Sequence, residues 1–160
     1  MPNVYEFLDL ISIEAIEMSG LISVRDAMTK PVKVVRTDTS VQEIVASMLK
    51  FDISSVVVVQ KDIPVGLVTH KDLLAKVWSP SFSPNIQTAR DVMNTPIVTI
   101  SEEASIDEAA QLMSSKKIKK LLAIRQGKLT GIITLVDIVR EQPKLLKLLD
   151  DLCRPHSQKK

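Results

Sequence analysis

One seven-residue phrase occurs twice in this chain, as GLVTHKD at Gly66–Asp72 and as GIITLVD at Gly131–Asp137. Each copy consists of a glycine, two apolar residues, a threonine, two variable residues and an aspartate. The surrounding sequence repeats as well, because residues 25–73 align with residues 90–138 without a gap, at an offset of 65 residues, and share eleven identities. Unrelated segments of this length would share about three, so the chain contains an internal duplication. Its fold must therefore contain two copies of one supersecondary unit.

The identities extend over the whole repeated unit, so the two copies are expected to share a fold. The chain has only four glycines, and two of them hold the same place in the two copies. In the first copy the identical residues are Arg25, Asp26, Met28, Pro31, Ser40, Glu43, Met48, Ile53, Gly66, Thr69 and Asp72.

Apolar periodicity and turn residues predict the order strand, helix, strand, strand, helix in each copy. The first helix of each copy begins at a capping box, Ser40/Glu43 and then Ser105/Glu108. In the first copy we expect strands at 32–36, 55–60 and 65–68, and helices from 40 to about 51 and from 69 to 78. In the second copy we expect strands at 97–100, 120–124 and 128–133, and helices from 105 to about 116 and from 134.

The predicted organisation has five parts. The terminal segments carry apolar stripes at helical spacing, and a short stretch rich in proline and serine separates the repeats. Units of about 60 residues are marginal alone, so we expect the two repeats to pack together. The parts are an N-terminal helix (1–20), repeat 1 (21–78), a linker (79–87), repeat 2 (88–142), and a C-terminal helix with a tail (143–160).

Composition narrows the functional class. The single cysteine, Cys153, excludes an internal disulfide, fits a reducing cytoplasm, and builds no metal site with the two histidines, His70 and His156. No apolar run approaches a membrane span, and the N-terminus lacks signal-peptide features. We find no nucleophile with a base and no convergent acids, so we expect no enzyme and no catalytic cofactor.

The repeated phrase places a threonine and an aspartate at the start of a helix. A hydroxyl and a carboxylate beside free backbone N–H groups suit a ribose diol with a phosphate nearby. The same Thr-x-x-Asp pattern is also a capping box, in which the two side chains bond only to the backbone. Both interpretations remain open from the residues alone.

The order of elements, the Met and Pro before the first strand, and the duplicated Gly-apolar-apolar-Thr-x-x-Asp ending resemble a tandem pair of cystathionine-β-synthase (CBS) domains, called a Bateman module. The resemblance covers about residues 22–140. It implies an α/β (α+β) fold of two βαββα repeats related by a pseudo-twofold axis, with clefts that bind AMP, ADP, ATP or S-adenosylmethionine. It also implies a regulatory module that transmits ligand occupancy to a partner.

By the same resemblance, ribose would be bound by Thr69 and Asp72 in one cleft and by Thr134 and Asp137 in the other. The family's base pocket maps to four residues just before the middle strands, namely Ile53, Ser54, Ile118 and Lys119.

The two copies of the phrase differ in charge. His70 and Lys71 follow the first threonine, where a bound phosphate would favour their positive charge, whereas Leu135 and Val136 follow the second. Before the middle strand of repeat 2, Lys119 or Lys120 is placed to reach a phosphate as a point charge, although such a lysine run is usually a solvated surface. We therefore expect two unequal clefts, at least one of which prefers a phosphorylated ligand.

Two other functions compete with a nucleotide sensor. A nucleic-acid binder would use the lysines of 116–120 and the basic tail, but with 3% aromatic residues the chain offers few stacking groups, so this is the weaker alternative. A purely structural dimerisation module would use the phrases only as helix caps. The apolar terminal helices favour a homodimer, and a regulated effector protein would have to bind in trans.

Overall fold

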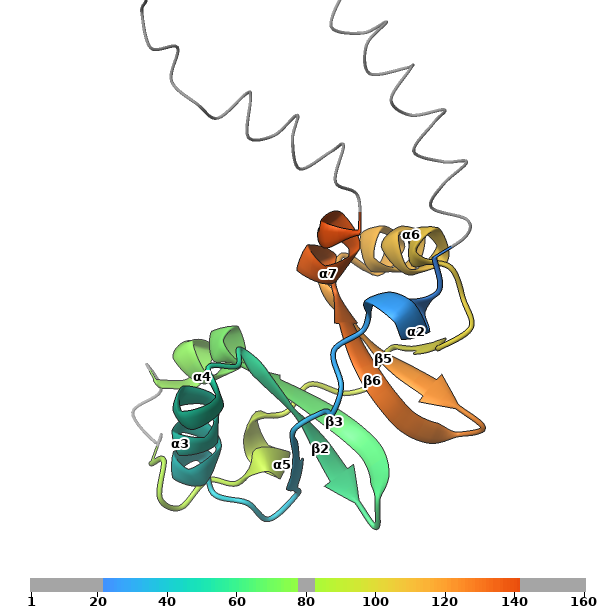
Figure 1. The fold of residues 1–160 in the computed structure, drawn as a ribbon. Helices are drawn as coiled ribbons and strands as arrows, with labels where there is room; N and C mark the ends of the chain where they lie inside the picture. The colour runs from blue at the N-terminus through green and yellow to red at the C-terminus, as the bar shows by residue number, and fades with distance from the viewer. Residues whose placement is uncertain (1–21, 78–82, 142–160) are drawn as a thin grey trace, which may run out of the picture. The chain divides into compact units, whose positions relative to one another are not determined.

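The computed structural model describes residues 22–77 and 83–141 of the chain. The predicted terminal helices and the helix end at Trp78 lie outside the described residues. The first repeat begins with a short helix, α2 (Val24–Ala27). The repeat itself comprises β1 (Val34–Arg36), α3 (Val41–Phe51), β2 (Ser55–Gln60), β3 (Ile63–Thr69) and α4 (His70–Val77) (Figure 1).

The second repeat follows the same plan. It also begins with a short helix, α5 (Ala89–Val92). Its elements are β4 (Thr99–Ser101), α6 (Ile106–Lys116), β5 (Lys120–Arg125), β6 (Lys128–Thr134) and α7 (Leu135–Arg140). The predicted α+β class and the order strand, helix, strand, strand, helix are therefore confirmed, with shorter first strands and a longer β3 than expected.

Each repeat forms one three-stranded sheet, in the orders β1-β2-β3 and β4-β5-β6. In the first sheet β1 is parallel to β2, and β2 is antiparallel to β3 with Ser55 opposite Thr69. The β2–β3 turn is formed by Lys61 and Asp62, both at positive φ, and the β5–β6 turn by Gln126 and Gly127, also at positive φ. Positive φ at both central residues is the type I′ geometry that matches strand twist.

The two repeats share the same pattern of buried residues as well as the same backbone plan. β2 and β5 share one burial pattern along their length, and β3 and β6 share another. The two long helices bury equivalent positions, which are Val41, Ile44 and Met48 in α3 and Ile106, Ala109 and Met113 in α6. Because the apolar positions recur at helical spacing, each helix covers its own sheet with one face.

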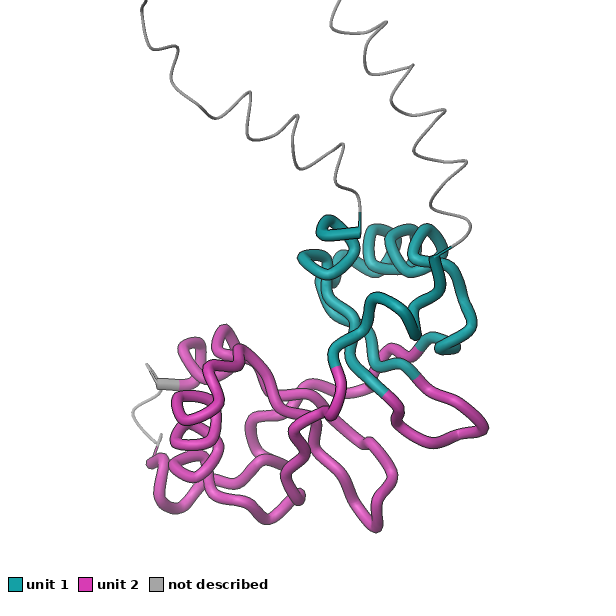
Figure 2. Tube along the Cα trace, viewed as in Figure 1, with its two compact units in different colours: residues 1–29, 100–123, 131–160 teal, residues 30–99, 124–130 magenta. Residues whose placement is uncertain are grey.

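The chain separates into two compact units that do not follow the order of the sequence (Figure 2). Within the described residues, unit 1 contains 22–29, 100–123 and 131–141, and unit 2 contains 30–77, 83–99 and 124–130. The short helix α2 thus belongs with the body of the second repeat, and α5 belongs with the body of the first.

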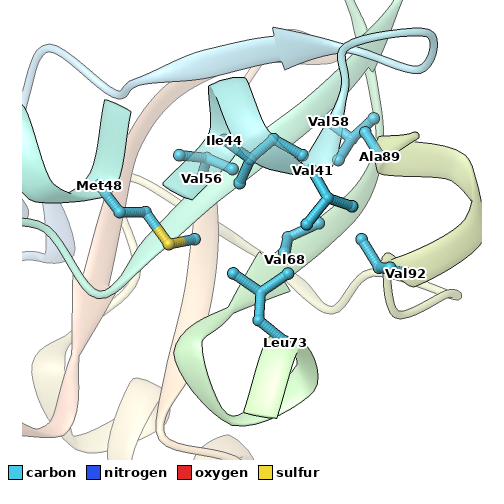
Figure 3. Packing of buried hydrophobic residues seen from close by; sticks show 9 residues of the cluster. All are labelled: Val41, Ile44, Met48, Val56, Val58, Val68, Leu73, Ala89 and Val92. Carbon is cyan, nitrogen blue, oxygen red and sulfur yellow. The ribbon is translucent and has the colours of Figure 1, made fainter. Parts of the chain in front are cut away.

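In unit 2, α5 packs on α3 and β3 of the first repeat. The N–H of Val41 donates to the carbonyl of Gln87 at 2.9 Å, and Leu67 and Asn94 exchange two backbone hydrogen bonds. Ala89 and Val92 enter the hydrophobic core of this unit beside residues of α3, β2, β3 and α4 (Figure 3). This core is made of Val41, Ile44, Met48, Val56, Val58, Val68, Leu73, Ala89 and Val92.

In unit 1, α2 takes the equivalent place on the second repeat. The N–H of Ile106 donates to the carbonyl of Ile22 at 3.1 Å, and Thr29 and Ile132 exchange two backbone hydrogen bonds. Val24 is fully buried there. The two repeats therefore exchange their leading segments, which are residues 22–29 and the equivalent residues 87–94. Each compact unit consequently contains residues from both repeats.

Candidate functional site

The first copy of the phrase ends β3 and begins α4 in unit 2. Asp72 Oδ2 accepts hydrogen bonds from the Thr69 N–H at 2.8 Å and from the Thr69 hydroxyl at 2.6 Å. The Asp72 N–H donates in return to the Thr69 hydroxyl oxygen at 3.4 Å. Within this capping box, only Oδ2 of the Asp72 carboxylate accepts hydrogen bonds. The second carboxylate oxygen, Oδ1, takes no part in the hydrogen bonds of the box.

The second copy repeats this geometry at the junction of β6 and α7 in unit 1. Asp137 Oδ2 accepts from the Thr134 N–H at 2.8 Å and from its hydroxyl at 2.7 Å. Asp137 Oδ1 lies 3.8 Å from Nη1 of Arg140. The Asp137 side chain is buried, and Asp72 is half-buried.

Both phrases form capping boxes, so the alternative interpretation of the motif is correct as local geometry. Within 22–77 and 83–141, capping boxes of this kind also begin α2, α3, α5 and α6. Their hydrogen bonds lie at the exposed surface, whereas those of Thr69/Asp72 and Thr134/Asp137 are partly buried. Burial, which the sequence pattern does not reveal, separates these two boxes from the other four.

The residues expected to line a base pocket lie next to each box. The Ser54 carbonyl accepts from the His70 N–H at 3.1 Å, and the Lys119 carbonyl accepts from the Leu135 N–H at 3.0 Å. Ile53 and Ile118, which precede these two residues, are half-buried. The structure thus brings each expected base-pocket pair to the threonine of its own unit.

The expected phosphate-binding cations differ in exposure. His70, Lys71 and Lys119 are exposed, whereas Lys120 is half-buried. Burial lowers the pKa of the Lys120 ammonium below its ordinary value, and the Asp137 carboxylate opposes part of that shift.

A methionine side chain packed against the glycine Cα explains the glycine of the phrase, which sequence reasoning did not assign. A methyl group at the Cα of Gly66 would lie 2.8 Å from Met93 Cγ, and one at Gly131 would lie 2.7 Å from Met28 Cγ. Met93 and Met28 belong to the exchanged leading segments. The repeated methionine and the repeated glycine were visible as identities, but their contact joins the leading segment of one repeat to the body of the other.

Two further observations concern the described residues alone. No helix in 22–77 or 83–141 is long and apolar enough to cross a bilayer. The same residues contain no group of three or more His, Cys, Asp or Glu side chains placed to hold a metal ion.

Two copies of a βαββα unit with partly buried Thr–Asp boxes at the end of each third strand define a tandem-repeat α+β module. A family model for the CBS domain matches residues 24–79 and again residues 89–144. The chain therefore belongs to the CBS domain family and carries a CBS pair, which is a regulatory module.

Two relatives in sequence with high identity are uncharacterized proteins. An uncharacterized protein of Methanopyrus kandleri is 37% identical over 134 residues, which cover 82% of this chain and 66% of the relative. An uncharacterized protein of Methanocaldococcus jannaschii is 31% identical over 138 residues, which cover 84% of this chain and 74% of the relative. The chain thus spans 66% of the length of the first of these relatives.

Solved structures share the fold. An uncharacterized conserved protein from Pyrococcus horikoshii superposes with a TM-score of 0.68 at 28% identity, covering 88% of this chain and 98% of that chain. A CBS domain pair solved in complex with 5′-methylthioadenosine and S-adenosyl-L-methionine superposes with a TM-score of 0.68 at 23% identity. That alignment covers 76% of this chain and 96% of the other.

Proposed function

We propose that this CBS pair senses an adenosine-containing ligand, such as AMP, ADP, ATP or S-adenosylmethionine, and transmits its occupancy to a partner protein. Thr69 and Asp72 bind the ribose at one site, and Thr134 and Asp137 bind it at the other. The first pair belongs to unit 2 and the second pair to unit 1, so each pair of ribose-binding residues lies within one compact unit.

The partial burial of these two boxes carries the proposal. A carboxylate that only caps a helix gains nothing from burial, because the surface boxes at Ser40/Glu43 and Ser105/Glu108 make the same bonds in water. The partly buried Asp72 and Asp137 pair one oxygen within the box and leave the other outside it. Ribose hydroxyls are donors that suit such an oxygen. A CBS pair of the same fold has been solved with two adenosine compounds, which supports this ligand class.

The bases and phosphates have proposed neighbours in each unit. Ile53 and Ser54 line the base in unit 2, and Ile118 and Lys119 line it in unit 1. The phosphate is proposed to lie towards His70 and Lys71 at the first site, and towards Lys119 or Lys120 at the second. The two sites would then be unequal, because their cations differ in number, place and exposure.

The remaining parts of the proposal concern assembly. We propose that the module acts as a homodimer, in the cytoplasm, on an effector protein bound in trans. The described helices support a further contact, since Leu49 on α3 and Leu74 on α4 are 77% and 66% exposed. Burial of these two side chains at an interface would remove their apolar surface from water, which is favourable.

Calorimetric titration of the full chain with adenosine, AMP, ATP and S-adenosylmethionine tests the proposal. We expect saturable binding of at least one of them, and about tenfold or more loss at one site in Asp72→Ala and at the other in Asp137→Ala, because a hydrogen bond to a charged group is lost. A ligand at one hundred times its dissociation constant should also add about 2.7 kcal/mol to the free energy of unfolding.

Helix-cap variants separate binding from capping. Glu43→Ala removes the exposed box that begins α3 in unit 2, and Glu108→Ala removes the exposed box that begins α6 in unit 1. Both should lower the free energy of unfolding but leave ligand affinity unchanged. If the aspartate variants also change only stability, or if no adenosine compound binds at millimolar concentration, the purely structural module is the correct interpretation.

A further inference from the structure

Met93 differs from the other methionines that the structure describes. The side chains of Met28, Met48 and Met113 are only 8%, 2% and 3% exposed. Met93 is half-buried and packs against the core of unit 2. A methionine becomes its sulfoxide where an oxidant reaches the sulfur, so exposure decides which thioether of a folded protein reacts first. In the described part of the chain, the thioether open to an oxidant is therefore that of Met93.

A comparison of Met93 with its equivalent, Met28, shows how the two side chains differ. Met93 packs on Gly66, and Met28 packs on Gly131. The atoms of Met28 nearest to a methyl group at Gly131 would be Sδ, Cγ and Cε, so the end of its side chain is folded onto the glycine. At Gly66 the nearest atoms are Sδ, Cγ and Cβ of Met93, and its terminal methyl group lies farther away. Met93 thus keeps its sulfur at the glycine but leaves part of its side chain in water.

Met93 also lies in a short segment at the surface. The helix α5 that precedes it has four residues, and its neighbours Asp91, Asn94 and Thr95 are exposed. After Met93, the segment is held to β3 by the two backbone hydrogen bonds between Asn94 and Leu67, at 2.9 and 3.2 Å. Short surface segments with few contacts open locally at a lower free energy than the core does. Such openings give an oxidant access to the sulfur without unfolding the sheet.

An oxygen on the sulfur of Met93 would destroy its fit to Gly66. Sδ lies so close to Gly66 that a methyl group at this glycine would overlap it. The sulfoxide is bulkier and polar, whereas the thioether is apolar. Held against the buried Gly66, the new oxygen would lose its hydrogen bonds to water, which costs free energy. The modified side chain therefore favours the open position of the segment.

We propose that Met93 is a modification site, at which a hydroperoxide such as hydrogen peroxide forms methionine sulfoxide and so weakens the attachment of α5 to the first repeat. In this step a lone pair of the sulfur forms the S–O bond and the O–O bond of the peroxide breaks. The departing hydroxide takes up the peroxide proton and leaves as water, so the sulfur is oxidised and the peroxide is reduced. The attachment of α2 in unit 1 stays intact, because Met28 is buried. The proposal requires no ligand and is independent of the proposed function.

Treatment of the full, folded chain with hydrogen peroxide, followed by peptide mass spectrometry, tests the site. We expect Met93 to gain one oxygen about tenfold faster than the three buried methionines, Met28, Met48 and Met113. In urea, where their burial is lost, the four should react at similar rates. Equal rates in the folded chain would overturn the proposal.

Hydrogen–deuterium exchange tests the consequence for the fold. The amides of Leu67 and Asn94 report the attachment of α5, and those of Thr29 and Ile132 report the equivalent attachment of α2. In the sulfoxide form we expect exchange at the first pair to be about tenfold faster and exchange at the second pair to be unchanged. Methionine sulfoxide reductases should restore the slow exchange. An unchanged first pair, or an equal change at both pairs, would contradict the proposal.

Three variants assign the effect to the sulfur of Met93. Met93→Leu keeps an apolar side chain of similar volume and should keep slow exchange at Leu67 and Asn94 after peroxide treatment. Met28→Leu is the matched control and should respond to peroxide as the wild type does. Met93→Gln puts a polar group near the position of the sulfur and should speed exchange at Leu67 and Asn94 without peroxide. If the wild type and Met93→Leu respond equally to peroxide, another residue is modified and the assignment is wrong.

Discussion

Met93 covers Gly66 so closely that a methyl group at the Cα of Gly66 would lie 2.8 Å from Met93 Cγ and 2.9 Å from Met93 Cβ. The two residues stand 27 positions apart, and the contact fixes the leading segment of the second repeat to the body of the first. Gly131 and Met28 form the equivalent contact in unit 1. The glycine of the phrase is thus a packing residue, and the ligand-binding proposal concerns the threonine and the aspartate.

The two glycines should not respond equally to substitution. At Gly66 the close atoms include Met93 Cβ, which moves only with the backbone, whereas at Gly131 they are Cγ, Sδ and Cε of Met28, which a rotamer change can move. We expect Gly66→Ala to lower the free energy of unfolding by about 1–3 kcal/mol, and Gly131→Ala to cost less. Urea denaturation of both variants measures this. In a double-mutant cycle, Met93→Ala should remove part of the loss in unfolding free energy that Gly66→Ala causes. Strictly additive losses in the double variant would show that the two residues do not interact.

Arg25 should matter more than its equivalent, Arg90. Arg25 Nε and Nη2 donate to Glu102 Oε1 at 3.0 and 2.7 Å, and Nη2 also contacts Glu103. Glu102 is only 4% exposed. Because Arg25→Ala weakens the pairing of a buried carboxylate, we expect a loss of about 1–3 kcal/mol in the free energy of unfolding.

The chain offers its own control for that ion pair. The position equivalent to Glu102 in the first repeat is Thr37, so Arg90→Ala leaves no carboxylate buried at that position and should cost less. Glu102→Thr in the Arg25→Ala background should recover part of the lost stability. Equal costs for the two arginine variants in chemical denaturation would show that the ion pair contributes nothing.

Asp91 should make stability depend on acid pH. The Thr88 N–H donates to its carboxylate at 2.8 Å and lowers the pKa of Asp91, and the Thr88 hydroxyl and Arg90 act in the same direction. A carboxyl whose pKa is lower in the folded state stabilises the fold above its ordinary value and loses that contribution as the pH falls through the folded value. The difference in unfolding free energy between wild type and Asp91→Asn should therefore be largest above about pH 4 and shrink towards pH 2.

A second variant tests the cause of that pH dependence. Thr88→Val removes the hydroxyl but keeps the backbone N–H, which makes the larger contribution. It should retain most of the dependence in urea unfolding followed from pH 7 to pH 2. Parallel stability curves for wild type and Asp91→Asn over this range would refute the assignment.

The two hairpin turns should differ in the conformational free energy that their residue at positive φ costs the fold. Asp62 has φ 63° in the β2–β3 turn, and its equivalent, Gly127, has φ 74° in the β5–β6 turn. A Cβ at Gly127 would meet no atom within 4 Å, so the difference is conformational. Asp62→Gly should stabilise the fold by up to about 1 kcal/mol and Gly127→Asp should destabilise it by a similar amount, measured as shifts in Tm. Shifts of the opposite sign would indicate that the Asp62 side chain has a stabilising contact.

Local sequence predicted the two main helices of each repeat, and each strand limit to within two residues, because their determinants lie within a few residues. It did not predict the short helices α2 and α5. The Ser40/Glu43 and Ser105/Glu108 boxes join residues three apart, and α3 and α6 begin where these boxes indicated. The Thr69/Asp72 and Thr134/Asp137 boxes were equally visible, because the pattern that suggests a ligand site is also a helix cap.

The duplication in the sequence by itself determined that one βαββα unit is built twice, with a Thr–Asp box after each third strand. Only the tertiary structure decided that α2 packs on α6 and α5 on α3, since a short apolar segment fits two equivalent surfaces and local pattern does not choose between them. It also decided that the boxes are partly buried. These features depend on contacts between residues distant in the sequence, which become neighbours only when the sheets and the exchanged helices have assembled.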